Sequence, residues 1–218
     1  MKDLDIHKVY KRIKEKVEEF KAPVVDLIEF QTEDPFKVLV ATILSARTKD
    51  ETTLQACKKL FKKVNKPADL NKLSKKEIEE LIYPVGFYHN KAEHLKQLPG
   101  VLEEKFEGII PETVDELTEL PGVGRKTANL VVAVGFKKPA MCVDTHVHKI
   151  SNRLGYVDTK TPLQTEMALR DKLPKKYWEK YNSKLVAFGQ NICTPVSPWC
   201  SKCPVEEFCE KKGVKNSR

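Results

Sequence analysis

Apolar residues recur at alternating steps of three and four along most of the chain, which is the spacing of an amphipathic helix. The opening segment carries such a stripe among charged neighbours, at Ile6, Tyr10, Ile13, Val17 and Phe20. A second helical face is formed by Leu54, Cys57, Leu60, Phe61 and Val64. No run alternates convincingly between apolar and polar residues at a period of two, so any sheet is minor. The pattern therefore predicts an all-α protein.

Helix-start signals mark several boundaries within this pattern. Asp34 followed by Pro35 predicts an N-cap and a helix over Phe36–Leu44. Three capping boxes are predicted, where Ser74 precedes Glu77, Thr113 precedes Glu116 and Thr161 precedes Gln164. The string Leu-Pro-Gly-Val occurs twice, at 98–101 and 120–123. Only the second copy continues as Gly-Arg-Lys, so we interpret the first as a helix break.

Charged residues make up 32% of the 218 residues, and the formal net charge is +8. This excess favours a polyanionic partner, with nucleic acid first and an anionic membrane surface second, although solvated lysine-rich faces are also common. No apolar stretch has the length of a signal peptide or a membrane span. We therefore expect a soluble, cytoplasmic protein with no membrane partner, in a compartment where thiols stay reduced.

Six cysteines are present, and four of them crowd near the C-terminus with the spacing C-x6-C-x2-C-x5-C. These four are Cys193, Cys200, Cys203 and Cys209. In a reducing compartment such clustering indicates metal ligands and not disulfides. Four thiolates on a compact loop suit either tetrahedral zinc or an iron–sulfur cluster. The remaining two, Cys57 and Cys142, lie on apolar segments and are expected in the core.

Residues 114–135 predict a helical hairpin. An apolar-faced helix carrying Val114, Leu117 and Leu120 is expected to end at Pro121. A tight turn, Gly122-Val123-Gly124, then leads into a second helix with Arg125 in its first turn. Glycine permits positive φ and close approach of another backbone, and N–H groups at a helix start bind phosphate. This is the arrangement of a helix-hairpin-helix, which grips the DNA backbone without reading its sequence. The alternative is an ordinary helical corner with glycine as a C-cap.

The string LPGVGRKTANLV at 120–131 resembles the hairpin of the endonuclease III family of DNA glycosylases. In that family the lysine after Gly-Arg is the catalytic nucleophile, which here is Lys126. An amine that captures the sugar C1′ also forms a Schiff base, whose acidified C2′ proton permits β-elimination. The family's second catalytic group is the aspartate of VDTH, which here is Asp144. The bland alternatives are an exposed helical lysine and an ordinary N-cap aspartate.

The resemblance also assigns the four clustered cysteines to a [4Fe–4S] cluster with a structural role. The loop between the first two ligands, at 194–199, departs from the family because it carries no lysine or arginine. Its contact with DNA phosphate is accordingly not carried over, and Lys202 is the nearby basic residue that could substitute.

Two further segments resemble those with which the family opens the duplex. Segment 43–53 matches the one that fills the gap left by an extruded base, and here it offers Arg47. Segment 85–95 matches the one that wedges the opposite strand, and here it offers Phe87. A surface arginine and a core phenylalanine are the alternatives. The expected DNA-contacting residues are Arg47, Phe87, Gly122, Val123, Gly124, Arg125 and His146; neither His146 nor His148 is given a catalytic role.

The resemblance runs from about Pro35 to Cys209. It implies an all-α, two-domain helix-hairpin-helix glycosylase fold with the active-site cleft between the domains. The expected helical barrel comprises residues 23–136, and residues 1–22 with 137–218 form the expected cluster domain. The implied activity is release of oxidised or damaged pyrimidines, followed by AP-lyase cleavage. The substrate is double-stranded DNA with damaged bases or abasic sites, and a monomer is expected.

Three other functions remain open on the sequence. One is a monofunctional mismatch or adenine glycosylase of the same superfamily, which the lysine at 126 disfavours. Another is a non-catalytic DNA-damage-binding module. The third is a zinc-stabilised helical scaffold with no DNA role.

Overall fold

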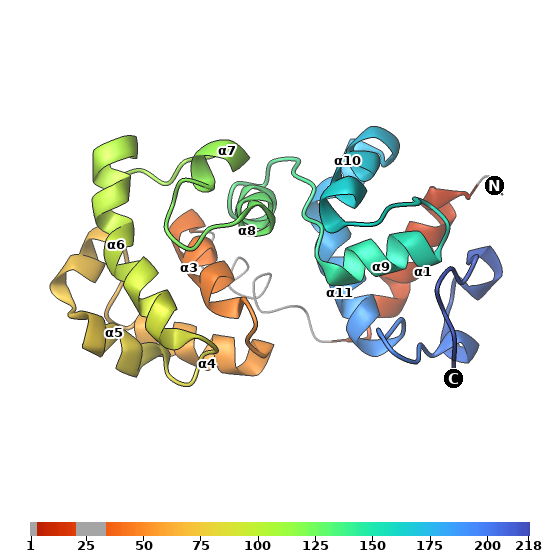
Figure 1. Cartoon of the computed structure of the whole chain (residues 1–218), viewed down its shortest axis with the longest axis horizontal. Coiled ribbons are helices and arrows are strands. Elements are labelled where there is room, and N and C mark those ends of the chain that lie inside the picture. Colours follow the sequence, from red (N-terminus) through yellow and green to blue (C-terminus); the bar gives the residue numbers. More distant parts are fainter. Residues whose placement is uncertain (1–3, 21–33) are drawn as a thin grey trace. The chain divides into compact units, whose positions relative to one another are not determined.

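The structure, a computed structural model, describes residues 4–20 and 34–218. Within these ranges the regular elements are all helical and no strand occurs, as the sequence pattern predicts. The α-helices are α1 (Ile6–Val17), α3 (Pro35–Ser45), α4 (Asp50–Leu60), α5 (Lys75–Ile82), α6 (Tyr88–Phe106), α7 (Val114–Leu117), α8 (Arg125–Leu130), α9 (Thr145–Arg153), α10 (Pro162–Lys172) and α11 (Trp178–Asn191) (Figure 1). Short 3₁₀ segments are η1 (Pro67–Lys72), η3 (Lys175–Tyr177), η4 (Cys200–Lys202) and η5 (Glu206–Phe208), and η2 (Val131–Gly135) is a π-helix.

The chain divides into two compact units. One comprises residues 24–140, and the other comprises residues 1–23 together with 141–218. The sequence places this boundary after residue 136, whereas the structural boundary follows Ala140. Met141 and Val143 account for the later position, because their side chains belong to the hydrophobic core of the second unit.

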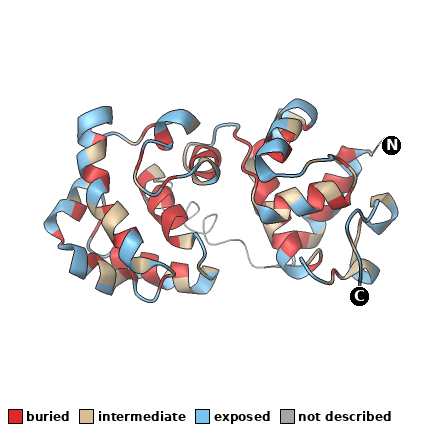
Figure 2. Cartoon of the chain, in the orientation of Figure 1, coloured by how far each residue is buried: buried red, intermediate tan, exposed pale blue. Residues whose placement is uncertain are grey.

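In the unit of residues 24–140, the central element is α3. Asp34 caps it by accepting a hydrogen bond from the Phe36 N–H at 2.9 Å, and Pro35 takes the first turn, as predicted. The helix is buried from Val38 to Leu44 and packs against α4, α6, α8 and η2. Figure 2 shows the buried residues concentrated along α3 and along the segment formed by α8 and η2. A helix this apolar on every side is stable only inside a core.

The prediction of a helix break at Pro99 and Gly100 is wrong, because α6 continues through both residues. Proline removes one helical hydrogen bond and glycine has a low helix propensity, so both weaken this turn locally. Burial outweighs that local preference. Leu95, Leu98 and Leu102 lie on one face of α6 and are completely buried, where the helix packs against α5 and η1.

The other unit is built around α1 and α11. The stripe predicted for the opening helix is confirmed, since Ile6, Tyr10, Ile13 and Val17 are buried in a core shared with α9 and α11. The largest fully buried side chains of α11 are Tyr181 and Phe188. No helix among residues 4–20 and 34–218 is long and apolar enough to cross a membrane.

Candidate active site and cysteine-lined cavity

The predicted hairpin is present, with a shorter first helix than expected. Helix α7 ends at Leu117, and the next residues form turns up to the start of α8. The Thr118 hydroxyl donates to the Asp115 carbonyl at 2.7 Å, a local bond that competes with further helix. Leu117 and Leu120 are nevertheless buried, as is Val123 in the turn. The apolar pattern thus anchors the hairpin although the helix stops early.

The two turn glycines have different structural roles. Gly122 has a φ of +76°, and a Cβ added to it would lie 2.5 Å from His94 Nδ1. Gly124 has an ordinary φ of −92°, and a Cβ there would meet nothing within 4 Å. Gly122 is therefore required by the fold itself. Gly124 leaves open space at the N-terminus of α8, where no side chain caps the helix.

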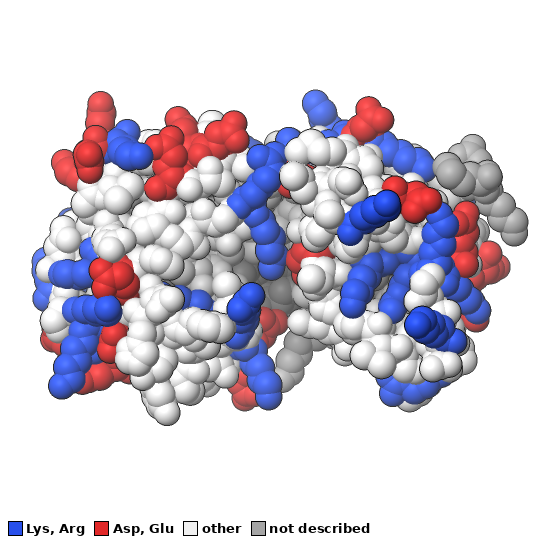
Figure 3. Space-filling model, viewed as in Figure 1, with Lys and Arg blue, Asp and Glu red and all other residues white. Residues whose placement is uncertain are grey.

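Lys126 is exposed in the first turn of α8, directly beyond this open space. Arg125 beside it lies 3.9 Å from Asp115, measured between Nη1 and Oδ1. On the face shown in Figure 3, acidic side chains gather over α7 and the C-terminal end of α6. Lys105 offsets one of these by bonding Glu119 at 2.8 Å. The net positive charge of the chain is therefore not concentrated on α7. Contact of the hairpin with a phosphate would depend on the backbone N–H groups at the start of α8.

Asp144 is the N-cap of α9 in the other unit. Its Oδ1 accepts a hydrogen bond from the Val147 N–H at 2.9 Å. Its other carboxylate oxygen accepts no hydrogen bond from the residues that the structure describes. The preceding residues 141–143 are buried, so the segment that leads to Asp144 is firmly anchored. The capping role and a catalytic role are compatible, because each can use a separate oxygen.

The two histidines of α9 occupy different surroundings. His146 packs on the backbone of α11, since a Cβ added to Gly189 would lie 2.2 Å from its Nδ1. His148 Nδ1 lies 2.7 Å from the Thr165 hydroxyl of α10. Burial lowers the pKa of His148, and the neighbouring Lys149 lowers it further. His148 therefore ties α9 to α10, and DNA contact by His146 stays a prediction.

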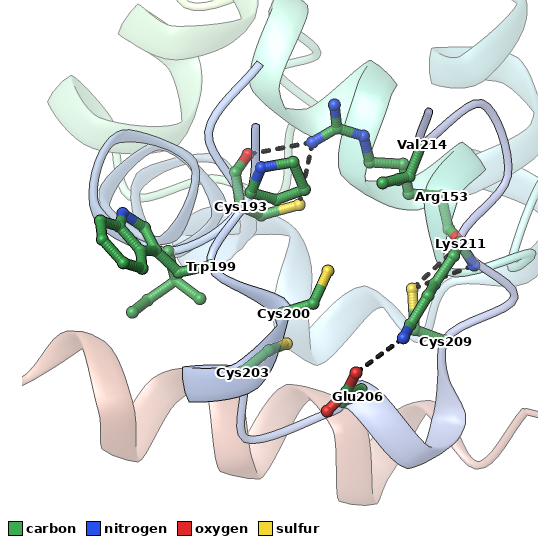
Figure 4. Close-up of a pocket in the computed structure, with 11 residues that line it drawn as sticks. Arg153, Cys193, Trp199, Cys200, Cys203, Glu206, Cys209, Lys211 and Val214 are labelled. Atoms are coloured by element: carbon green, nitrogen blue, oxygen red, sulfur yellow. Dashed lines mark hydrogen bonds and ion pairs between the residues drawn. The ribbon is translucent and has the colours of Figure 1, made fainter. Parts of the chain in front are cut away.

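The four clustered cysteines surround one cavity in the C-terminal part of the chain (Figure 4). Two of them, Cys200 and Cys203, lie on and just after η4, and Cys193 follows α11. Within the described ranges, no group of three or more His, Cys, Asp or Glu side chains is arranged to hold a metal ion. The donor set of four facing thiols is nevertheless the one that iron–sulfur clusters use. As predicted, Cys57 and Cys142 are buried elsewhere.

Burial sets the chemistry of these thiols. It raises the pKa of Cys193 and Cys209, and it raises that of Cys203 to about 12. Thiols with such pKa values stay protonated at neutral pH. Binding of a cationic metal group would therefore release protons from them.

Arg153, which sequence reasoning missed, organises this cavity. Its buried guanidinium donates to the Cys193 sulfur at 3.2 Å and to the Thr194 carbonyl at 2.9 Å. It also donates to the Pro195 carbonyl at 2.7 Å. The backbone carbonyl of Arg153 accepts a hydrogen bond from the Cys209 thiol at 3.2 Å. One residue therefore connects two of the four thiols to the loop at 194–199.

Basic residues lie beside the loop at 194–199, although the loop itself contains none. Lys202 Nζ lies 4.7 Å from the centre of a Trp199 ring, and the Arg218 guanidinium lies 4.0 Å from the Trp199 ring. Arg218 also donates from Nη2 to the Ser197 carbonyl at 2.8 Å. The structure therefore adds Arg218 to Lys202 as a cation next to this loop.

Arg47 and Phe87 lie together in the unit of residues 24–140. The Arg47 guanidinium carbon is 5.4 Å from the centre of the Phe87 ring, and 60% of Phe87 is exposed. Phe87 is therefore not the core residue that one alternative predicts. Sequence reasoning missed Lys91, which lies behind both and is only 6% exposed. A signal was present, since Lys91 falls on the same helical stripe as the buried Leu95 and Leu98.

Known proteins match most of this chain. The sequence model of the HhH-GPD superfamily base excision DNA repair proteins matches residues 40–175. The chain is 50% identical over 177 residues to endonuclease III of Thermotoga maritima, covering 81% of this chain and 83% of that protein.

Solved structures match over a similar span. A trapped covalent intermediate of endonuclease III with DNA, an estranged-adenine complex, matches with a TM-score of 0.77 and 40% identity over 82% of this chain and 85% of that one. A thermostable thymine-DNA glycosylase matches with a TM-score of 0.74 and 26% identity over 93% of this chain and 97% of that one. The chain therefore belongs to the HhH-GPD superfamily of base excision repair proteins, and within it to the endonuclease III family, which consists of DNA glycosylases with AP-lyase activity.

Proposed function

We propose that this protein releases oxidised or otherwise damaged pyrimidines from double-stranded DNA and then cleaves the strand by β-elimination. The observation that carries the proposal is the placement of Lys126. Its amine is exposed in the first turn of α8, beyond a glycine whose missing side chain leaves room for a backbone to approach. The covalent intermediate named for the related endonuclease III is consistent with an enzyme nucleophile of this kind.

In the proposed reaction, Lys126 Nζ attacks C1′ of the damaged nucleotide as the bond from C1′ to the base breaks. The departing base takes up a proton, and loss of a proton from nitrogen with ring opening gives a Schiff base to Lys126. Removal of the C2′ proton then expels the 3′ phosphate and cuts the strand. Asp144 uses the carboxylate oxygen that does not cap α9 to stabilise the cationic sugar and to assist the proton transfers.

The four cavity-lining cysteines, Cys193, Cys200, Cys203 and Cys209, are the proposed ligands of a [4Fe–4S] cluster. When bound, this group would crosslink the C-terminal segment. Arg153 prepares the site by holding the Cys193 sulfur and the loop at 194–199 in place. The cluster has no part in the chemistry at C1′ in this proposal.

We propose that Gly122, Val123 and Gly124 present the N-terminus of α8 to a DNA phosphate, with Arg125 beside it. Arg47 and Phe87 are proposed to enter the duplex, one to occupy the gap left by the extruded base and the other to stack on the opposite strand. His146 is proposed to contact the backbone near Asp144. The protein is proposed to act as a monomer.

Borohydride trapping tests the nucleophile. Wild-type protein mixed with a panel of duplexes carrying damaged pyrimidines should release the base and give a covalent protein–DNA adduct on reduction. Lys126→Gln should give no adduct, and Lys58→Gln, which changes an exposed lysine of α4, should give as much as wild type. Asp144→Asn should slow base release by about 10²- to 10⁴-fold. Base release by the wild type without any adduct would refute the lyase mechanism and favour a monofunctional glycosylase.

A further inference from the structure

Lys91 is a buried lysine bonded only to uncharged oxygens. Its Nζ donates to the Leu44 carbonyl at 2.8 Å, to the Ala46 carbonyl at 2.6 Å and to the Thr48 hydroxyl at 3.2 Å. These three bonds use all three ammonium hydrogens, and Lys91 forms no ion pair with any residue in the described ranges. Burial lowers the pKa of Lys91 to about 8. An ammonium kept in such a place requires a structural or functional explanation.

Two of the three hydrogen-bond acceptors of Lys91 lie at the C-terminal end of α3. Leu44 lies in the last turn of α3 and Ala46 is the C-cap of that helix, so the ammonium binds the negative end of the helix dipole. The next residue is Arg47, in the left-handed region with a φ of 55°. The Lys91 side chain thus fixes the backbone on both sides of Arg47, through Ala46 and Thr48.

The backbone of Lys91 holds the other loop. Its N–H donates to the Phe87 carbonyl at 3.1 Å, which fixes Phe87 at the start of α6 with a φ of 58°. The two loops also touch directly, because the Gly86 N–H donates to the Thr48 hydroxyl at 3.1 Å. A Cβ on Gly86 would lie 2.6 Å from the Arg47 carbonyl oxygen. No residue larger than glycine fits between the loops without a backbone shift.

We propose that Lys91 is a positioning residue for base extrusion, whose side chain and backbone together hold Arg47 and Phe87 as one preformed pair. This inference rests on the proposed function, in which these two side chains enter the duplex. Both residues have backbones in the left-handed region, which is unfavourable for side chains of their size. The bonds from Lys91 offset that strain before DNA arrives. Arg47 and Phe87 are then already ordered in the free protein, so DNA binding does not include the entropic cost of ordering them.

The experiment measures unstacking of the duplex separately from chemistry. A fluorescent adenine analogue that brightens on unstacking is placed beside an oxidised pyrimidine, and fluorescence is followed after mixing with excess enzyme. We expect Lys91→Met to slow unstacking by about ten- to a hundredfold. Borohydride trapping on a single-stranded abasic oligonucleotide should stay at the wild-type rate. Thr48→Val, which removes one acceptor of Lys91 and the bond to Gly86, should slow unstacking in the same direction and decides the question if Lys91→Met does not fold.

A matched control lies on the same helix. Lys96 Nζ also donates to carbonyls, those of Asn71 at 3.1 Å and Leu73 at 2.7 Å, which lie away from Arg47 and Phe87 in the sequence. Lys96→Met should therefore leave the unstacking rate unchanged. In an Arg47→Ala/Phe87→Ala background, Lys91→Met should slow unstacking no further, because the pair through which it acts is gone.

The outcomes separate the inference from the proposed function. If Arg47→Ala and Phe87→Ala leave unstacking unchanged, the pair does not enter the duplex; the role proposed for the pair and the inference about Lys91 then both fail, while the chemistry proposed for Lys126 is tested separately by borohydride trapping. If those changes slow unstacking while Lys91→Met and Thr48→Val do not, only the inference is overturned. Additive slowing by Lys91→Met in the Arg47→Ala/Phe87→Ala background would also overturn it, because Lys91 would then act independently of the pair.

Discussion

Substitution of Gly122 by alanine should destabilise the protein through two separate effects. The first is conformational, since Gly122 has a φ of +76°, and an L-residue in this region costs roughly 1–2 kcal/mol. The second is steric, because the new Cβ would lie 2.5 Å from His94 Nδ1, 3.0 Å from Cγ and 3.2 Å from Cβ. These atoms lie near the base of the His94 side chain. The clash is therefore relieved only if the His94 side chain adopts another rotamer or the backbone of α6 shifts. Such overpacking costs roughly 1–3 kcal/mol.

The two contributions sum to roughly 2–5 kcal/mol, a large share of the stability of an ordinary domain. Urea denaturation followed by helical circular dichroism measures the change, with wild type and Gly122→Ala compared at a fixed slope. A loss below about 1 kcal/mol would refute the reasoning, because neither the strain nor the clash would then be present at its expected size.

Gly124→Ala is the control for this prediction. Its φ of −92° is open to any residue, and a Cβ would meet nothing within 4 Å, so stability should change by less than about 0.5 kcal/mol. The added methyl group would instead occupy the space in which a phosphate is proposed to approach α8. Binding to an abasic duplex should therefore weaken although the fold is intact. Equal affinity of Gly124→Ala and wild type for such DNA would contradict the proposed backbone contact.

Three further predictions concern other parts of the chain. Gly100→Ala should stabilise the protein by about 0.5–1 kcal/mol in urea denaturation, because Gly100 lies inside α6 with nothing within 4 Å of an added Cβ. Burial lowers the pKa of Lys91 from 10.5 to about 8, so between these pH values the unfolded chain holds more protons there. The stability of wild type relative to Lys91→Met should therefore rise with pH across this window; a flat difference would contradict it. Arg153→Met should lower the iron and sulfide content of purified protein, since Cys193 and the Thr194 carbonyl lose their donor.

Features encoded by neighbouring residues were predictable from the sequence. The capping boxes at Ser74 and Thr161 are present, because each needs only residues three positions apart. The prediction of a helix break at Pro99 and Gly100 was wrong, because it rested on neighbouring residues where distant ones decide the structure. Local preference there is overruled by packing of α6 against α5, which the sequence does not display.

The candidate site divides in the same way. Lys126 and Asp144 could be proposed from the sequence because each lies in a short motif that fixes its local position at a helix start. Lys91 and Arg153 act through carbonyls at distant positions, up to 47 residues away for Lys91. Such partners are brought near only by tertiary packing. In the sequence, such a contact is indicated by a single charged residue at a position where the helical pattern otherwise has apolar residues.

The interleaved order of the two units has a consequence for how the chain folds during synthesis. Residues 24–140 form one unit and emerge from the ribosome before residues 141–218. Helix α1 precedes this unit in the chain, whereas its packing partner α11 follows the unit. The apolar face of α1 therefore waits without its partner while the whole intervening unit is synthesised and folds. The cysteine-bearing segment follows α11, so the four thiols can come together only after residues 24–140 have been synthesised.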